Sequence, residues 1–272
     1  MTEPQPQTIQ SFACVDHAAD PGALVRFLET VSSRYFGALN ARSFALLRVA
    51  PGAAVLEAGC GSGIDAVALK TLVGPEGRVV GMDSSQVMLS QAVERATKNG
   101  SPVEFYLGDA QRLTFDDGTF DGVRSSRLLC HLDEPRRALT EMIRVLRPGG
   151  HLVAIEPDHD TLVIASPQRD CTRKIVNAFG DGFRDGWSGR WLPVWCRELG
   201  LCDIQVEPHT IQMEYEFVMD AIGLRKKVEQ LQQAGSITAA EASEWMTYQK
   251  RAAEAGSFFS AITVFMVAGR KE

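Results

Sequence analysis

The feature of the sequence that most constrains the fold is an alternation of short apolar strands with helical segments between residues 51 and 157. The strand candidates read AAVLEAG, RVVGMD, VEFYLGD, FDGVRSS and HLVAIEP, and most of them are separated by apolar residues at helical spacing. Strands joined through helices pair in parallel, and right-handed crossovers place the helices on both faces of the sheet. We therefore predict an α/β fold with a doubly wound sheet.

The rest of the chain is expected to complete one domain with three parts. Residues 1–50 supply a loose tail over residues 1–10 and a helical lid, residues 51–157 form the ligand-binding core, and residues 158–272 supply cap segments and the last strands. Apolar positions between residues 22 and 48 favour one or two helices before the first strand. LCDIQVEPHTI and AITVFMVAGR are two further strand candidates.

A glycine-rich turn follows the first strand, with Gly59, Gly61 and Gly63 at alternate positions. Glycine permits positive φ and lets a ligand lie against bare backbone at the carboxyl edge of a parallel sheet. Asp83 ends the second strand, where a carboxylate can accept hydrogen bonds from both hydroxyls of a ribose. This pattern indicates a nucleotide-like ligand.

The identity of that ligand depends on the charges around the turn. The glycines also fit the dinucleotide pattern G-x-G-x-x-A, in which Asp83 would serve NAD. Glu57 stands directly before the turn, where its carboxylate would repel a pyrophosphate but attract the ammonium of an amino acid. Asp109 ends the third strand and offers a further acceptor. The charges favour a ligand that combines an amino acid with a nucleoside.

Five motifs in this order resemble those of the class I methyltransferases that use S-adenosylmethionine (SAM): Glu57-Ala-Gly-Cys-Gly-Ser-Gly, Val-Val-Gly-Met-Asp83, Gly-Asp109-Ala, FDGVRSSRLLCHL and RVLRPGGHLVAIEP. The resemblance covers about residues 51–157. It is greatest to the small-molecule branch known as methyltransferase type 11, which includes the ubiquinone and menaquinone C-methyltransferases. It implies a Rossmann-like sheet of seven strands whose last strand, near residues 261–269, is antiparallel.

The resemblance also implies SAM as the cofactor, S-adenosylhomocysteine as its product, and a set of binding residues. The residues implied are Glu57, Gly59, Gly61, Gly63, Ser126 and Arg127 at the methionine end, Asp83 at the ribose, and Ser84, Met88, Asp109, Ala110 and Gln111 around the adenosine. No metal ligand is expected, because the six cysteines and five histidines show no metal-binding spacing.

Methyl transfer from a sulfonium is an in-line displacement that depends mainly on positioning, and a base helps where the acceptor must lose a proton. His131 is the leading candidate for this base, because it follows the fourth strand at the edge where the sulfonium would lie. Many relatives have two adjacent histidines here, whereas this sequence reads Cys130-His131. Asp158 and His159, after the expected fifth strand, are the second candidates.

Net charge and hydropathy indicate which classes of substrate and partner this protein is expected to have. The net charge of -6 argues against a nucleic-acid substrate, and no apolar run is long enough to span a bilayer. We expect a cytoplasmic protein with reduced cysteines that acts on a small molecule, as a monomer or a homodimer. Aromatic residues between 179 and 195 suggest an apolar acceptor pocket. Two other functions are considered: a non-methylating reaction such as a cyclisation on the same fold, and an NAD-dependent oxidoreductase.

Overall fold

The computed structural model describes residue 12 and residues 15–272, so the tail expected over residues 1–10 lies outside the described residues. The described part contains one sheet of seven strands in the order β3-β2-β1-β4-β5-β7-β6. The strands are β1 (Ala54–Ala58), β2 (Arg78–Asp83), β3 (Glu104–Leu107), β4 (Phe120–Ser126), β5 (Leu146–Ile164), β6 (Leu201–Gln212) and β7 (Ser260–Lys271).

The pairing directions confirm the predicted sheet. Strands β1 to β5 pair in parallel, while β7 lies between β5 and β6 and is antiparallel to both. The carboxyl ends of β1, β2 and β4 therefore meet at one edge, on either side of the point where the strand order reverses. Ligands of doubly wound sheets bind at this kind of edge.

From residue 21 onward, twelve helical segments connect or flank these strands. They are α1 (Pro21–Val31), η2 (Ser32–Phe36), α2 (Gly37–Leu46), α3 (Ile64–Val73), α4 (Gln86–Lys98), η3 (Leu129–His131), α5 (Pro135–Val145), α6 (Arg169–Gly180), α7 (Ser188–Glu198), η4 (Phe217–Ala221), α8 (Leu224–Gln233) and α9 (Ala239–Glu254). The helices predicted before the first strand correspond to α1, η2 and α2.

Alternate residues of the central strands enter two separate apolar cores. Val55, Val153 and Ile155 belong to the core under α2 and α3, whereas Leu56 and Leu152 belong to the core under α5 and α7. Side chains of a strand point alternately to opposite faces, so a sheet covered by helices on both sides needs apolar residues at both sets of positions. This explains the nearly continuous apolar runs in the sequence.

Strand β5 is longer than predicted. The sequence indicated a strand over residues 151–157, but β5 begins at Leu146 and continues to Ile164 because β7 pairs with it as far as Ile164 opposite Ser260. The helix before it, α5, ends at Val145. Asp158 and His159 consequently lie within β5 instead of after it, next to an irregularity in its pairing with β7.

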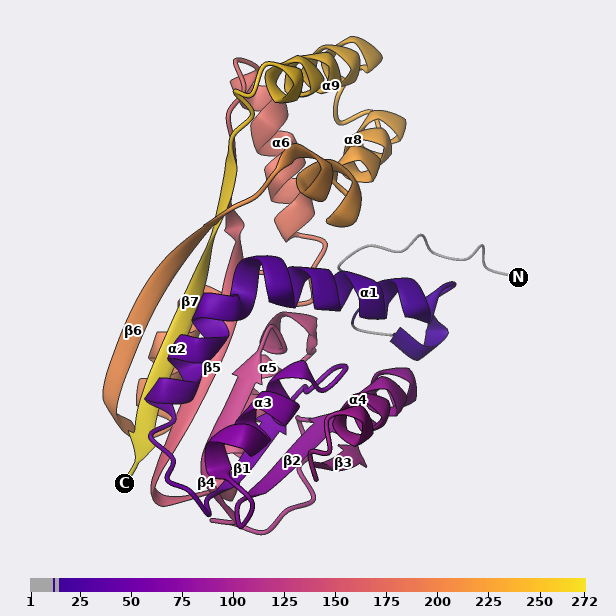
Figure 1. The fold of residues 1–272 in the computed structure, drawn as a ribbon. Helices are drawn as coiled ribbons and strands as arrows, with labels where there is room; N and C mark the ends of the chain where they lie inside the picture. The colour runs from indigo at the N-terminus through magenta and orange to yellow at the C-terminus, as the bar shows by residue number, and fades with distance from the viewer. Residues whose placement is uncertain (1–11, 13–14) are drawn as a thin grey trace.

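The long strands carry a group of helices away from the core. Figure 1 shows α6, α8 and α9 at the far end of β5 and β7, with α1 crossing between these helices and the carboxyl edge of the sheet. In residues 12 and 15–272, no helix is long and apolar enough to cross a membrane. The same residues contain no group of three or more His, Cys, Asp or Glu placed to hold a metal ion.

Candidate functional site

A pocket of about 480 Å³ lies at the carboxyl ends of β1, β2 and β4, under α1 and η2. One end is lined by the turn after β1 and by the residues that follow β2, β3 and β4. The other end is lined by apolar side chains of α1, η2, α6, η4 and the long strands β6 and β7. The pocket thus joins a polar end, where most of the predicted ligand residues lie, to an apolar end.

The backbone of the glycine turn is built as predicted. Gly59, Gly61 and Gly63 have φ values of 70°, 50° and 78°, in the left-handed region that favours glycine. Gly59 and Gly61 line the pocket, but Gly63 does not. A Cβ on Gly63 would lie 2.8 Å from the Cβ of Ala92 in α4. Gly63 therefore lets α3 pack closely on α4, and a contact of Gly63 with the methionine end stays a prediction.

The end of β2 and the residues beyond it form one wall of the pocket. Asp83, Ser84 and Met88 all line the pocket. Asp83 Oδ2 accepts a hydrogen bond from the amide of Gly61 at 2.8 Å, and its Oδ1 accepts from the amide of Ser85 at 3.0 Å. Burial raises the pKa of Asp83. This carboxylate therefore stabilises the glycine turn while lining the pocket beside it.

Asp109, Ala110 and Gln111 follow β3 and also line the pocket. Asp109 Oδ1 accepts from the backbone amide of Gln111 at 2.8 Å and from its side-chain amide at 3.1 Å. Gln111 Oε1 in turn accepts from the amide of Glu134, at 2.8 Å, just before α5. The chain of hydrogen bonds fixes this loop against α5.

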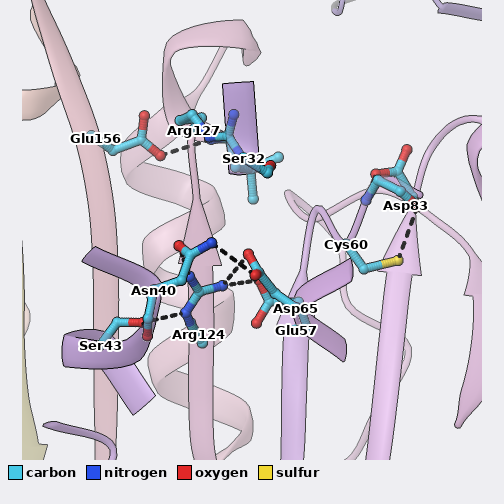
Figure 2. Close-up of polar contacts among 12 residues, drawn as sticks. Ser32, Asn40, Ser43, Glu57, Cys60, Asp65, Asp83, Arg124, Arg127 and Glu156 are labelled. Carbon is cyan, nitrogen blue, oxygen red and sulfur yellow. Dashed lines mark hydrogen bonds and ion pairs between the residues drawn. The ribbon is translucent and has the colours of Figure 1, made fainter. Parts of the chain in front are cut away.

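Glu57 lies in a buried charge network that the sequence analysis missed. Its Oε1 accepts from Arg124 Nη1 at 2.5 Å, and the same nitrogen donates to Asp65 Oδ2 at 3.1 Å (Figure 2). Burial raises the pKa of Glu57 to about 7, against the lowering effect of Arg124. Glu57 Oε2 has no hydrogen-bond partner in the described residues. A charged residue within an otherwise apolar strand was the signal in the sequence that could have identified Arg124.

The end of β4 has an unusual backbone at a predicted ligand position. Arg127 has a positive φ of 55°, and its amide donates to the carbonyl of Ile155 at 2.8 Å. Its Nη2 donates to Ser32 Oγ of η2 at 2.9 Å, and its guanidinium lies 4.3 Å from the ring centroid of Phe36. Ser126 and Arg127 both line the pocket. A non-glycine residue held in this region is typical of functional sites.

Glu156 of β5 shapes the loop after β4 from behind. Its Oε1 accepts from the amides of Leu128 and Leu129, both at 2.8 Å, and its carboxylate faces Arg127 (Figure 2). Burial raises the pKa of Glu156 to about 7. Because two amides hold one oxygen, Glu156 fixes the turn that places Arg127 in the pocket.

The N-terminal segment contacts the polar end of the pocket, which the sequence did not indicate in detail. Asp16 accepts from the amides of Gln86 and Val87 at the start of α4, at 2.8 and 3.2 Å. A Cβ on Gly61 would lie 2.7 Å from Leu28 Cδ2 of α1. The helical lid is therefore tied to the residues that follow β2 and lies directly on the glycine turn.

The apolar end combines side chains from distant parts of the chain. Its lining includes Phe27, Val31, Tyr35, Phe36, Phe179, Phe183, Ile211, Met213, Phe217, Ile222, Ile262 and Val264. Tyr35 donates a hydrogen bond to Glu214, which fastens η2 to the residues after β6. The predicted aromatic lining is confirmed for Phe179 and Phe183. Trp187 and Trp191 are not part of it, and their side chains are exposed.

Two histidines stand on the wall of the pocket. His159 is buried and stacks on Phe183 with ring centroids 3.4 Å apart, while His131 lies 6.0 Å from the same ring. Neither nitrogen of His159 has a hydrogen-bond partner in the described residues. Burial lowers the pKa of His131 to about 4, with help from the charges of Arg127 and Arg184, and lowers that of His159 to about 3. Both imidazoles are neutral at pH 7.

Asp158 is not brought into the pocket. It is buried and accepts from Arg190 Nε and Nη2 at 2.5 and 2.6 Å, which ties β5 to α7. Strand alternation points Asp158 and His159 to opposite faces of the sheet, and only the His159 side faces the pocket. The prediction of Asp158 as a base is therefore corrected to a structural ion pair.

Comparisons with known proteins show what this domain is similar to. Residues 55–150 match the family described as methyltransferase domain, within the region where the sequence motifs lie. The chain is 39% identical over 118 residues to the demethylmenaquinone methyltransferase of Staphylococcus carnosus, which covers 43% of this chain and 48% of that protein. It therefore resembles the class I SAM-dependent methyltransferases, and among them the menaquinone C-methyltransferases.

A longer similarity links the chain to an uncharacterised transposon protein of Streptomyces fradiae. The two are 38% identical over 219 residues, which is 80% of this chain and 62% of that protein. The chain thus spans less than two thirds of the length of either of these relatives.

Solved structures of different activity share the fold. A phosphoethanolamine N-methyltransferase of Haemonchus contortus in complex with SAM has a TM-score of 0.60 at 17% identity, covering 98% of this chain and 61% of that one. The [4+2]-cyclase SpnF has a TM-score of 0.52 at 21% identity, covering 86% and 80%. These likenesses establish the fold, and the reaction has to be argued from the site.

Proposed function

We propose that this chain is a SAM-dependent methyltransferase that passes the methyl group to an oxygen, nitrogen or carbon atom of a small, largely apolar acceptor. One observation carries the proposal. A single pocket joins a polar end, with carboxylates at the carboxyl ends of three neighbouring strands, to an aromatic-rich apolar end. A cofactor with an amino acid, a ribose and an adenine fits the first end, and a hydrophobic acceptor fits the second.

The polar end suggests a specific arrangement of SAM. The free oxygen of Glu57 would accept from the ammonium, with the backbone at Gly59 and Gly61 beside the methionine moiety. Asp83 would accept from the ribose hydroxyls, and Asp109 from the adenine amino group. Ser84, Met88, Ala110 and Gln111 would surround the adenosine, and Ser126 and Arg127 would close the methionine side.

The apolar end suggests how the acceptor is recognised. Aromatic and branched side chains favour a mainly hydrocarbon or aromatic molecule. His159 presents two nitrogens without protein partners, so one polar group of the acceptor would form a hydrogen bond there. His131 is our candidate for the group that removes a proton from the acceptor, since it lines the pocket beside the residues that follow β4.

Methyl transfer depends mainly on how the acceptor atom is positioned relative to the methyl group. Methyl transfer from the sulfonium proceeds in line when the acceptor atom is held at about 3–3.5 Å from the methyl carbon. The closed lid and the rigid strand ends would supply this alignment. A neutral imidazole with a low pKa is a weak base, so we expect His131 to contribute at the lower end of the usual range for proton transfer.

Cofactor binding tests the proposal directly. We expect SAM and S-adenosylhomocysteine to raise the melting temperature of the protein, and NAD to leave it unchanged. The Asp83→Ala variant should bind S-adenosylhomocysteine about 10- to 100-fold more weakly, the scale of a charged hydrogen bond of about 1.5–3 kcal/mol. Stabilisation by NAD alone would replace the proposal with an oxidoreductase, and unchanged affinity of Asp83→Ala would remove Asp83 from the site.

Turnover separates methyl transfer from the rival reaction on the same fold. Incubation with SAM and a panel of apolar phenols, amines and acidic carbon compounds should release S-adenosylhomocysteine in proportion to methylated product. An acceptor that is cyclised or otherwise converted while SAM remains intact would instead favour the non-methylating alternative.

A further inference from the structure

Arg124 is a fully buried arginine in the middle of β4, surrounded by strands and helices of the core. Burying a guanidinium is costly unless its hydrogen bonds and charge are satisfied. Arg124 meets this condition, because its side chain forms four hydrogen bonds with neighbouring side chains. Such a complete set of contacts suggests a role beyond filling space.

The four contacts join the lid to the cofactor end of the pocket. On one side, Arg124 donates from Nε to Ser43 Oγ at 2.7 Å and from Nη2 to Asn40 Oδ1 at 2.7 Å, both in α2. On the other side, Nη1 donates to Glu57 Oε1 in β1 and to Asp65 Oδ2 in α3. Figure 2 shows Arg124 between these two groups.

The partners of Asp65 and Glu57 show which oxygen remains available. Asp65 uses both of its oxygens, because Oδ1 accepts from Asn40 Nδ2 at 2.8 Å. Glu57 uses only Oε1, and its Oε2 has no hydrogen-bond partner in the described residues although Glu57 lines the pocket. Among the described residues, the network therefore leaves one buried carboxylate oxygen of Glu57 without a partner at the wall of the pocket.

The charges of the cluster agree with a cationic group in the pocket. Glu57 and Asp65 carry two negative charges when ionised, and Arg124 returns one positive charge. One negative charge is left in this cluster, with Arg127 already facing Glu156 nearby. A buried charge requires a partner, and an ammonium at Glu57 Oε2 would supply it.

We propose that Arg124 is a positioning residue that holds the Glu57 carboxylate for the ammonium of the cofactor and couples this contact to helix α2. The inference rests on the proposed function, since it takes SAM as the ligand. Arg124 does not line the pocket and acts through Glu57. Without it, the buried carboxyl of Glu57 would lose the cation that favours its ionised form.

The experiment compares two ligands that differ in the amino-acid moiety. S-adenosylhomocysteine carries the ammonium, whereas 5′-methylthioadenosine lacks it and reports only on the adenosine site. Measured by calorimetry, Arg124→Met should lower the affinity for S-adenosylhomocysteine about 10- to 100-fold. The same variant should change the affinity for 5′-methylthioadenosine less than about 3-fold. Arg124→Lys should recover part of the lost affinity, because it keeps the charge but cannot bridge all four acceptors.

Arg144 provides a matched control. It also forms several hydrogen bonds, to Glu141, Asp117 and the carbonyls of Leu113 and Phe115, but it does not line the pocket or contact Glu57. Arg144→Met should lower the melting temperature and leave the ratio of the two affinities unchanged. If Arg144→Met changes this ratio as much as Arg124→Met does, the inference is wrong.

The remaining outcomes also decide for or against this inference. The positioning role is overturned if Arg124→Met lowers the affinity for both ligands equally, or if it lowers the affinity for neither. If Arg124→Met does not fold, Arg124→Lys and Asn40→Ala replace it in the test. Each of them must lower the affinity for S-adenosylhomocysteine more than the affinity for 5′-methylthioadenosine. A wild-type protein that binds S-adenosylhomocysteine, with an affinity that Arg124→Met leaves unchanged, overturns this inference alone, whereas a wild-type protein that does not bind S-adenosylhomocysteine overturns the proposed function as well.

Discussion

His131 shows how much a single residue depends on its surroundings. The sequence suggested an imidazole with an ordinary pKa near the sulfonium, but burial and two arginines lower its pKa to about 4. The neutral form therefore dominates at pH 7, and the driving force for removing a proton is small. As the proposed base, His131 would therefore mainly accept a hydrogen bond, and in part a proton, from the acceptor.

We expect His131→Asn to lower kcat by about 10²-fold, the lower end of the range for general bases. The affinity for S-adenosylhomocysteine should stay unchanged, because the predicted cofactor contacts do not include this imidazole. His151→Asn is the control. His151 lies in the first half of β5, far along the strand from His159, and does not line the pocket. An unchanged kcat in His131→Asn would exclude His131 from the reaction.

At the scale of elements, the glycine turn serves two purposes that its spacing does not separate. Gly61 lies under the lid helix α1, while Gly63 lies between α3 and α4. A Cβ on Gly63 would also come within 3.0 Å of the Ala92 backbone, which cannot move without shifting α4. The Cβ of an alanine at position 61 would meet the end of the flexible Leu28 side chain.

Gly63→Ala should therefore lower the free energy of unfolding by about 2–4 kcal/mol, the sum of a left-handed backbone cost and overpacking. Gly61→Ala should lower the free energy of unfolding less than Gly63→Ala does. It should lower the affinity for S-adenosylhomocysteine more, because it disturbs the pocket wall and the lid over it. Urea unfolding and calorimetry of the folded variants measure the two effects. The reverse order in either measurement would contradict these assignments.

For the whole molecule, buried titratable groups make stability depend on pH in opposite directions. His131 and His159 have folded pKa values of about 4 and 3, below the usual 6.5, so they stabilise the fold above pH 6.5 and this contribution is lost as the pH falls. Glu57 and Glu156 have pKa values raised to about 7, so their contribution is lost as the pH rises from 4.5 to 7.

His159→Leu isolates one of these contributions. Between pH 7 and pH 5 the wild type should lose about 2 kcal/mol more of its free energy of unfolding than the variant does, because only the unfolded state of the wild type gains a proton at this position. Urea titrations of both proteins at the two pH values give the difference. Parallel losses would mean that His159 is protonated in the folded protein.

The central strands illustrate what could be predicted and why. Strands β1 to β4 and the residues that follow them were recognised from local apolar runs, turns and motifs, and most of the predicted cofactor residues do line the pocket. The extension of β5 to Ile164 was not recognised, because it depends on pairing with β7 about a hundred residues later. The same holds for the apolar end of the pocket, which collects side chains from α1, α6, η4 and β7.

The sequence by itself determined the doubly wound sheet and the row of acidic residues along one edge, because these follow from periodicity and from motifs in a fixed order. The antiparallel strand was expected only from the resemblance to a known family. Only the tertiary structure decided what surrounds Gly63, Asp158 and Arg124. Each of these depends on a partner distant in the chain: Ala92 packs against Gly63, Arg190 neutralises Asp158, and Glu57 and Asn40 surround Arg124. Such contacts are set by how the layers pack, which local patterns do not specify.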